Sequence, residues 1–336
     1  MEKQDLSESS PWSIRGKDFP TDGNIEEKLK FILRYAILAP SSHNTQPWKF
    51  YLDENTVKIY IDMDRWLKVA DSDKRELHIS IGCAVENLTV AANSFGYACE
   101  VNYLPKTDHK DPAVSIKLKN SSSQSSSDSK DLFEAIRARH TNHNIYDANS
   151  VEEEKLQKLE NYAQEEGIYL HLTDDASIKR EVDSLMIKGD AMQFADPEWR
   201  EELGYWMGQG VFGTSWLTSK MSQLAVTYLN MGKSTAKKDS ELLMSAPILG
   251  VISSGSDERE SRIKAGRTFE RLALTAASLN VSLHPMSQIL EIPELKSEVT
   301  KLIPVADVYP QQTFRLGYAE PERKHTPRRP LQEVLV

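Results

Sequence analysis

Apolar residues recur every three or four positions near the start of the chain, after a polar opening stretch. Between residues 26 and 38 this spacing predicts a helix with one buried face. Asn24 is a suitable N-cap, and Pro40 ends the helix because proline cannot continue it. Two strand-like runs follow, at residues 49–52 and 57–62. The chain is therefore predicted to begin with a helix and a pair of strands.

A second and longer helix is predicted between residues 77 and 95. It is apolar on most of its sides, which is typical of a helix buried in the centre of a protein. Gly96 ends this helix, and residues 99–104 then have the pattern of a strand.

The second part of the chain repeats this plan. A long helix rich in small and apolar residues is predicted at residues 262–279, and a strand-like run follows it at 281–285. Because the two long helices occupy matching places, the pattern indicates a weak internal repeat. The other elements predicted in this part are helices at 131–139 and 152–166 and strands at 168–172 and within 242–253.

A serine-rich stretch at residues 120–130, with the sequence NSSSQSSSDSK, divides the two parts. Such a stretch cannot bury enough apolar surface to offset its ordering entropy, so it should be a flexible linker or an exposed loop. The sequence therefore predicts a shorter first half at 1–119 and a longer second half at 131–336.

An insertion at about residues 188–238 interrupts the second half. It contains three tryptophans, Trp199, Trp206 and Trp216, together with several glycines, and no clean period runs through it. Such a segment is either a lid over a site or a packing arm, and both interpretations stay open.

Composition and charge exclude several classes of function. The net charge of −9 argues against a nucleic-acid-binding surface, and no apolar run approaches the roughly 18 residues of a membrane-spanning helix. The polar N-terminal stretch lacks the apolar core of a secretory signal, so we expect a cytoplasmic protein with no membrane partner. The histidines are scattered and the two cysteines, Cys83 and Cys99, are isolated, so we expect no metal site.

The most specific segment of the sequence is residues 39–48, which read APSSHNTQPW. It places two prolines, hydroxyls and carboxamides between a predicted helix and a predicted strand. These side chains offer uncharged donors and acceptors, which suit the edge of a flat heteroaromatic ring. Serine and asparagine also favour turns for purely local reasons, so turn chemistry is the alternative explanation.

This segment closely resembles the conserved loop of the nitroreductase superfamily, and residues 34–50 as a whole resemble the Acg-type branch of that superfamily. Residues 75–88 are similar to the central helix of the branch, and residues 137–142 to its arginine-rich phosphate motif. Residues 284–288 and the segment from 314 to 330 are similar to its C-terminal half. The similar segments span nearly the whole chain in the expected order.

The resemblance implies an α+β fold with mixed, largely antiparallel sheets flanked by helices, in two pseudo-symmetric halves of one chain. It also implies an FMN bound between the halves. The residues assigned to the isoalloxazine ring from the first half are Pro40, Ser41, Ser42, Asn44 and Gln46. The residues assigned from the second half are Arg139 and Thr141 for the phosphate and ribityl chain, Pro285, Met286, Ser287 and Gln288 for the ring near N5, and Arg315, Arg328 and Arg329 around the phosphate.

One position departs from the family pattern. His143 stands where the motif usually has a basic residue near N1 and O2 of the flavin, and histidine is only partly cationic near neutral pH. The first half also lacks an arginine motif of its own, so we expect one FMN per chain.

The activity that the resemblance implies is hydride transfer from NAD(P)H through FMN to a nitroaromatic or quinone-like acceptor. The flavin carries this chemistry, so no catalytic side chain is expected. An alternative is a protein that sequesters FMN under a closed lid with little turnover. A weaker option is a dehydrogenase acting on a peptide-derived ring. We expect no nucleic-acid partner and a pseudo-dimeric monomer, with further dimerisation left open.

Overall fold

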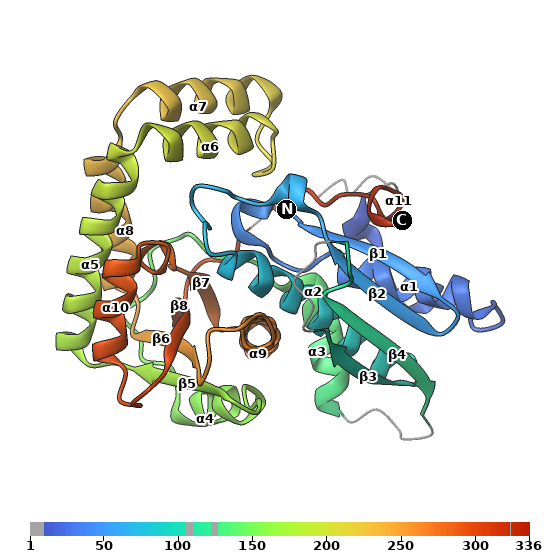
Figure 1. Cartoon of the computed structure of the whole chain (residues 1–336). Helices are drawn as coiled ribbons and strands as arrows, with labels where there is room; N and C mark the ends of the chain where they lie inside the picture. The colour runs from blue at the N-terminus through green and yellow to red at the C-terminus, as the bar shows by residue number, and fades with distance from the viewer. Residues whose placement is uncertain (1–9, 105–109, 122–126, 323) are drawn as a thin grey trace.

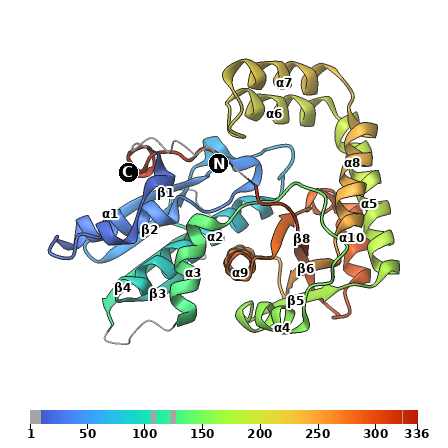
Figure 2. The same cartoon turned by 180° about the vertical axis from the view of Figure 1, so that it is seen from behind.

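The computed structural model describes residues 10–104, 110–121, 127–322 and 324–336, and it contains two separate four-stranded sheets. Figures 1 and 2 show the sheets on opposite sides of a pair of central helices. All strand pairs within the sheets are antiparallel. The expected α+β class is confirmed.

The first sheet has the order β1-β2-β4-β3 and the second the order β5-β6-β8-β7, so the two sheets share one arrangement. The first consists of β1 (Trp48–Asp53), β2 (Thr56–Ile61), β3 (Tyr97–Tyr103) and β4 (Val114–Asn120). The second consists of β5 (Ile168–Thr173), β6 (Ile248–Ser254), β7 (Ser282–Pro285) and β8 (Tyr309–Gly317).

The two long predicted helices are α2 (Arg75–Ser94) and α9 (Arg259–Ser278), and they pack against each other between the sheets. Glycine makes this contact possible. A Cβ at Gly82 would lie 2.1 Å from Ile263 O, and a Cβ at Gly266 would lie 2.1 Å from Ile79 O. Because α2 is covered on nearly all sides, its apolar residues need no single face.

Four helices of the second half cover the predicted insertion, and the first and last of them extend beyond it. They are α5 (Ala176–Ala195), α6 (Pro197–Gly208), α7 (Trp216–Tyr228) and α8 (Gly232–Ser245). Helices α5 and α8 pack side by side, and α6 and α7 form a hairpin that projects beyond them (Figure 1). The region that showed no clean period in the sequence is therefore almost wholly helical.

The remaining helices are α1 (Ile25–Ala36), α3 (Ser127–Ala138), α4 (Glu153–Tyr162), α10 (Pro293–Leu302) and α11 (Leu331–Val334), with short 3-10 turns at Pro11–Ser13, Gly16–Asp18, Ser42–Asn44, Met63–Arg65 and Gln288–Leu290. Of these helices, α1, α3 and α4 pack on the central pair, α10 packs on α5 and β8, and α11 lies on β1. The C-terminal segment crosses to the first sheet, where the Val336 backbone N–H donates to Phe50 O at 2.9 Å. The second half therefore completes the packing of the first.

Some predicted boundaries need correction. Residue 120 ends β4, and residues 127–130 already belong to α3, while the middle of the predicted linker, 122–126, lies outside the described residues. The strand predicted within 242–253 begins only at residue 248, because 242–245 are the last turn of α8. No helix in the described part of the chain is long and apolar enough to cross a membrane.

Candidate functional site

A cavity of about 630 Å³ lies between the two halves and is lined by residues from both. This volume falls within the roughly 300–1,000 Å³ of pockets that hold small organic ligands. Its lining includes one side of the central helix α2, with Glu76, Ile79, Ser80 and Cys83. Most of the residues predicted from the sequence also line it: Pro40, Ser41, Ser42, Asn44, Arg139, Thr141, His143, Pro285, Ser287, Gln288 and Arg328.

The loop after α1 forms one wall of the cavity in a strained backbone conformation. His43, Asn44 and Gln46 have φ values of 46°, 52° and 53°, in the left-handed region that non-glycine residues rarely adopt. Such strain costs roughly 1–3 kcal/mol per residue and persists only where surrounding contacts impose it. Here the Gln46 N–H donates to Ser41 Oγ at 2.9 Å, and the Ser42 N–H donates to Ser80 Oγ at 3.2 Å.

Asn44 connects this loop to two distant segments. Its amide nitrogen donates to Val211 O at 2.7 Å and to Pro327 O at 2.9 Å, and its Oδ1 accepts from Arg328 at 2.9 Å. The carboxamide is therefore fully used within the protein. It fixes the loop against the insertion and the C-terminal segment.

Two buried arginines, Arg139 and Arg328, line the cavity. Burial, together with the charge of Arg139, lowers the pKa of Arg328 to about 9. The Nε of each guanidinium has no hydrogen-bond partner among the described residues. Buried donors of this kind favour an anion that accepts charge-assisted hydrogen bonds.

One carboxylate partly offsets these cations. Arg139 Nε lies 3.4 Å from Glu270 Oε1, and the Glu270 side chain is fully buried. Burial raises the pKa of Glu270 to about 7, although Arg139 and Arg328 lower it. Near neutral pH, Glu270 is therefore only partly ionised, and the arginine pair keeps excess positive charge.

A stack of three rings stands beside the arginines. The His325 ring lies 3.9 Å from the Trp12 ring and 3.8 Å from the His140 ring. Burial and the neighbouring charges of His140, Arg139 and Arg328 lower the pKa of His325 to about 3, so this ring is neutral. The Arg328 guanidinium also lies 4.9 Å from the Trp12 ring centre.

His143 lies on the wall contributed by the second half. Its ring is 4.5 Å from that of His284, and its backbone N–H donates to Glu322 Oε1 at 3.2 Å. Partial desolvation lowers the pKa of His143, although its side chain is 59% exposed, and Glu322 acts in the opposite direction. The imidazole at this position is therefore mainly neutral at physiological pH.

The 285–288 segment lines the cavity through only some of its residues. Ser287 Oγ donates to Thr313 O at 3.1 Å, and Gln288 Nε2 donates to Asp239 Oδ2 at 3.2 Å. Met286 differs from the expectation. Its N–H donates to Thr313 O at 2.8 Å and its side chain belongs to an apolar cluster with α5, α8 and α10, so it is committed to the fold.

Arg315 also differs from the expectation: it contacts neighbouring segments of the protein and does not line the cavity where the phosphate was expected. Its fully buried guanidinium donates to Asn142 O at 3.2 Å and to Asn144 O at 2.8 Å, and it stacks 3.8 Å from the Tyr146 ring. It is not among the described residues that line the cavity. Arg315 therefore holds the 142–146 segment in shape.

Arg329 and Gln46 bind each other instead of lining the cavity. The Arg329 backbone N–H donates to Gln46 Oε1 at 2.7 Å, and its guanidinium lies 3.3 Å from Asp62 Oδ2. Neither residue is part of the described cavity lining. They attach the C-terminal segment to the first half and thereby place Arg328.

Several residues of the lining were not predicted from the sequence. Phe212 and Gly213 come from the loop between α6 and α7, and Trp12 comes from a short turn near the N-terminus. No local motif marks them. The remaining unpredicted lining residues are His43, Glu76, Ile79, Ser80, Cys83, His140, Phe269, His284, Glu291, Gln312, Glu322, Lys324, His325 and Thr326.

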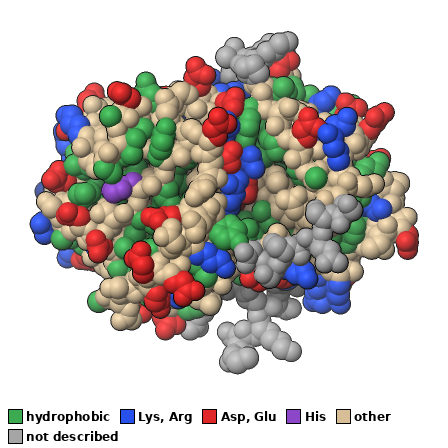
Figure 3. Space-filling view, turned by 90° about the horizontal axis from the view of Figure 1, so that it is seen from below, with side chains coloured by type: hydrophobic (Ala, Val, Ile, Leu, Met, Phe, Trp, Pro, Cys, Tyr) green, Lys and Arg blue, Asp and Glu red, His purple; other side chains and the backbone are tan. Residues whose placement is uncertain are grey.

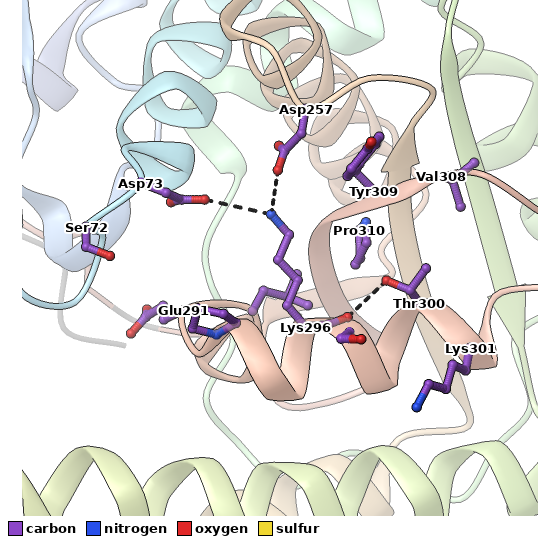
Figure 4. Close-up of a pocket in the computed structure, with 13 residues that line it drawn as sticks. Ser72, Asp73, Asp257, Glu291, Lys296, Thr300, Lys301, Val308, Tyr309 and Pro310 are labelled. Atoms are coloured by element: carbon purple, nitrogen blue, oxygen red, sulfur yellow. Dashed lines mark hydrogen bonds and ion pairs between the residues drawn. The ribbon is translucent and has the colours of Figure 1, made fainter.

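A second cavity, of about 540 Å³, lies beyond Glu291, which borders both cavities (Figure 4). Lys296 Nζ lies 2.9 Å from Asp257 Oδ2 and 3.8 Å from Asp73 Oδ2. Although burial opposes it, hydrogen bonds from Arg262, Gln311 and Lys296 hold the pKa of Asp257 well below its usual range. These three charges already satisfy one another, and none of the described residues that line this cavity is an arginine.

The chain is similar to known proteins over most of its length. Residues 19–92 match the family described as "Putative TM nitroreductase". A "Putative NAD(P)H nitroreductase" of Mycobacterium tuberculosis is 26% identical over 92% of this chain and 91% of its own. A "Putative NAD(P)H nitroreductase acg" of the same organism is 25% identical over 91% of this chain and 94% of its own.

Two further matches are also named nitroreductases. A "Probable NAD(P)H nitroreductase PigM" of Serratia is 25% identical over 92% of this chain and 93% of its own. A nitroreductase structure with bound FMN from Bacteroides fragilis is 16% identical, with a TM-score of 0.39 over 58% of this chain and 94% of its own. The family match and the full-length relatives agree with the motifs in the loop and the central helix: the chain is similar to nitroreductases, an Acg protein among them, over more than 90% of its length.

Proposed function

We propose that this protein is an FMN-dependent oxidoreductase that passes hydride from NAD(P)H to a nitroaromatic or quinone-like acceptor. The observation that carries the proposal is the pair of buried arginines, Arg139 and Arg328, in the lining of a cavity whose loop wall is uncharged. FMN has this polarity, with a dianionic phosphate at one end and a neutral ring system at the other.

The residues of the cavity fit FMN in the following way. Arg139 and Arg328 would hold the phosphate, because a guanidinium makes paired hydrogen bonds to its oxygens. Thr141 would contact the ribityl chain. The hydroxyl groups of Ser41 and Ser42 would border the ring. When bound, FMN accepts and returns the hydride, and the protein supplies orientation, electrostatics and access.

The chain's own contribution to turnover is to position the reactants and exclude water. The strained loop is held by the Ser80 and Asn44 contacts, so its geometry exists before any ligand binds. Phe212 borders the cavity from the insertion and lies 6.4 Å from the His43 ring. Burial lowers the pKa of His43 to about 4, which keeps that ring neutral beside the cofactor.

A second candidate function is sequestration of FMN with little turnover. The specific observation in its favour is the bond from Asn44 to Val211 O, which fastens the α6–α7 loop over the cavity. A loop that stays fastened would block NAD(P)H, whereas a loop that opens would admit it. The two functions therefore differ in whether the α6–α7 loop opens.

The experiment is anaerobic reduction of the purified protein. A yellow protein whose visible absorbance bleaches with NADH or NADPH, and recovers on addition of a nitroaromatic or a quinone, supports the oxidoreductase. A yellow protein that bleaches with dithionite but not with either nucleotide supports sequestration. A protein that cannot be reconstituted with FMN contradicts both.

A further inference from the structure

Glu291 borders both the main cavity, of about 630 Å³, and the second cavity, of about 540 Å³. It follows the short turn Gln288–Leu290 and precedes α10, so its backbone lies between two structured elements. Its side chain is held as well, because Gln193 Nε2 of α5 donates to Glu291 Oε2 at 2.7 Å. A carboxyl group is therefore fixed at the boundary of the two cavities.

The charged groups that act on Glu291 from α2 and the turn before it are Arg75, Glu76 and Asp71. All three are buried, and Arg75 Nη2 lies 2.6 Å from Glu76 Oε1. Asp71 accepts hydrogen bonds from the backbone N–H groups of Glu76 and Leu77, both at 2.8 Å. One arginine thus stands against three carboxyls. Because like charges that share a buried site disfavour one another, one of the carboxyls is favoured to keep its proton.

The cations of the neighbouring helices are committed to other carboxylates. Lys296 of α10 lies 2.9 Å from Asp257 Oδ2 and 3.8 Å from Asp73 Oδ2. Figure 4 shows the Lys296 ammonium directed to these two groups and away from Glu291. Arg262 of α9 pairs with the same two aspartates. These cations therefore do not offset the surplus of carboxyls around Glu291.

Burial and these neighbours keep a proton on the Glu291 carboxyl. Desolvation is the largest cause and raises the pKa of Glu291 well above its usual range, while the charge of Glu76 raises it further and that of Arg75 lowers it. On the outer face shown in Figure 3, by contrast, acidic and basic side chains are interspersed and water screens them. Near neutral pH, Glu291 is therefore a neutral acid at the wall of the main cavity.

The second cavity connects this carboxyl to the solvent. Exposed residues contribute to its lining: Ser72, Asp73, Ser297 and Lys301. Each α2 residue in the lining of the main cavity is buried, by contrast. Protons can therefore reach Glu291 from the second cavity without passing through the main cavity.

We propose that Glu291 donates a proton to the acceptor during hydride transfer and recovers it from solvent through the second cavity. The inference rests on the proposed function, and it departs from the expectation that no side chain takes part in catalysis. A quinone becomes a hydroquinone by gaining one hydride and one proton. The O–H bond of the Glu291 carboxyl breaks, its proton joins the quinone oxygen that gains negative charge, and the electron pair of the bond stays on the carboxylate. A solvent proton then restores the acid, so that NAD(P)H, one proton and the quinone give NAD(P)⁺ and the hydroquinone.

Glu76 is the alternative donor, and it fits less well. It also borders the main cavity, but its carboxylate pairs directly with Arg75. It is not among the described residues that line the second cavity. A proton lost from Glu76 would therefore lack the route back from solvent that Glu291 has.

The first test uses the flavin-free protein, so it does not depend on turnover. The infrared spectrum of the wild type at pH 8 should contain a carbonyl band of a protonated carboxyl that Glu291→Gln removes. The matched control is Glu294→Gln, which changes an exposed carboxyl of α10 and should leave the band in place. A band that is absent from the wild type, or that survives in Glu291→Gln, would mean that Glu291 has no proton to give and would overturn the proposal.

The second test is anaerobic reoxidation of the FMN-loaded protein after reduction with dithionite. Reoxidation by a quinone should be at least about a hundredfold slower in Glu291→Gln, on the scale of general acid catalysis, and unchanged in Glu294→Gln. Ferricyanide accepts an electron without a proton, so it should reoxidise both variants at close to the wild-type rate.

The outcomes separate this inference from the proposed function. Equal quinone rates in the wild type and in Glu291→Gln would overturn the inference alone. Equal losses with quinone and ferricyanide would also overturn it, because they would assign Glu291 a structural role. A wild type that no quinone reoxidises would contradict the proposed function, and the inference would fall with it.

Discussion

At the residue scale, the arginine pair and its carboxylate carry the electrostatics of the cavity. Replacing Arg139 with alanine should weaken FMN binding by about 1.5–3 kcal/mol, the range for a hydrogen bond to a charged group. The loss should be much smaller for riboflavin, which has no phosphate. Fluorescence titration of the apoprotein with both flavins measures this difference, and Arg180→Ala, at an exposed position, is the control.

Arg329 provides a contrast to Arg139. Since its guanidinium pairs with Asp62 and its backbone N–H binds Gln46, Arg329→Ala should weaken FMN and riboflavin to a similar extent. A loss of affinity for FMN without a matching loss for riboflavin would contradict this, because it would show that Arg329 contacts the phosphate.

Glu270 should make stability fall as pH rises. Its pKa is raised to about 7 in the folded protein, so the folded state keeps a proton that the unfolded chain releases near its ordinary value of 4.5. The stabilisation is complete below about pH 4.5 and is lost as pH rises to about 7. Glu270→Gln should therefore match the wild type at low pH and exceed its free energy of unfolding by on the order of 3 kcal/mol above pH 8.

Denaturant titrations of the flavin-free protein from pH 5 to pH 8 measure this effect. Glu166→Gln, at an exposed position, should parallel the wild type throughout. A constant difference between the Glu270→Gln variant and the wild type over this range would mean that the carboxylate does not titrate there.

Only some residues of the site could be predicted from the sequence, because a residue type alone does not say whether a side chain lines the cavity or holds the fold. The 39–48 loop concentrates its chemistry within ten consecutive residues, so its position was evident in the sequence. Arg328 and Arg329 are neighbours in sequence, yet one lines the cavity and the other binds Asp62. Arginines that bind anions and arginines that hold loops look alike until the fold places them.

At the element scale, the α2–α9 contact is the centre of the molecule. Gly82→Ala would place a Cβ 2.1 Å from Ile263 O, a backbone atom that cannot move without displacing its helix. We expect a loss of at least about 2 kcal/mol in the free energy of unfolding. Gly255→Ala, whose Cβ would lie 3.9 Å from Tyr169, is the matched control and should be nearly neutral. A neutral Gly82→Ala would mean that the helices are farther apart than described.

Elements with a clear period were predicted well, whereas some of those without one were not. The helix α1 has one buried face and a capping box at Asn24, so its pattern was plain. Strand β8 is buried along nearly its whole length, so it lacks the alternation that identifies strands. Helix α7 has its apolar stripe on the solvent side, so periodicity could not indicate how it packs.

At the scale of the whole molecule, the repeat visible in the sequence became two sheets with one strand order around two central helices. The two halves nevertheless differ, because β1 and β2 form a hairpin, whereas β5 and β6 are separated by α5–α8. The arginine pair and the strained loop meet at one cavity. We therefore expect the pseudo-symmetric arrangement to provide one flavin site per chain.

The flavin content of the purified, fully reconstituted protein tests this account most directly. Flavin released by denaturation is identified and quantified by its absorbance and compared with the protein concentration. The account predicts FMN at close to one per chain. Release of nearly two per chain, or a protein that neither carries nor rebinds FMN, would contradict it.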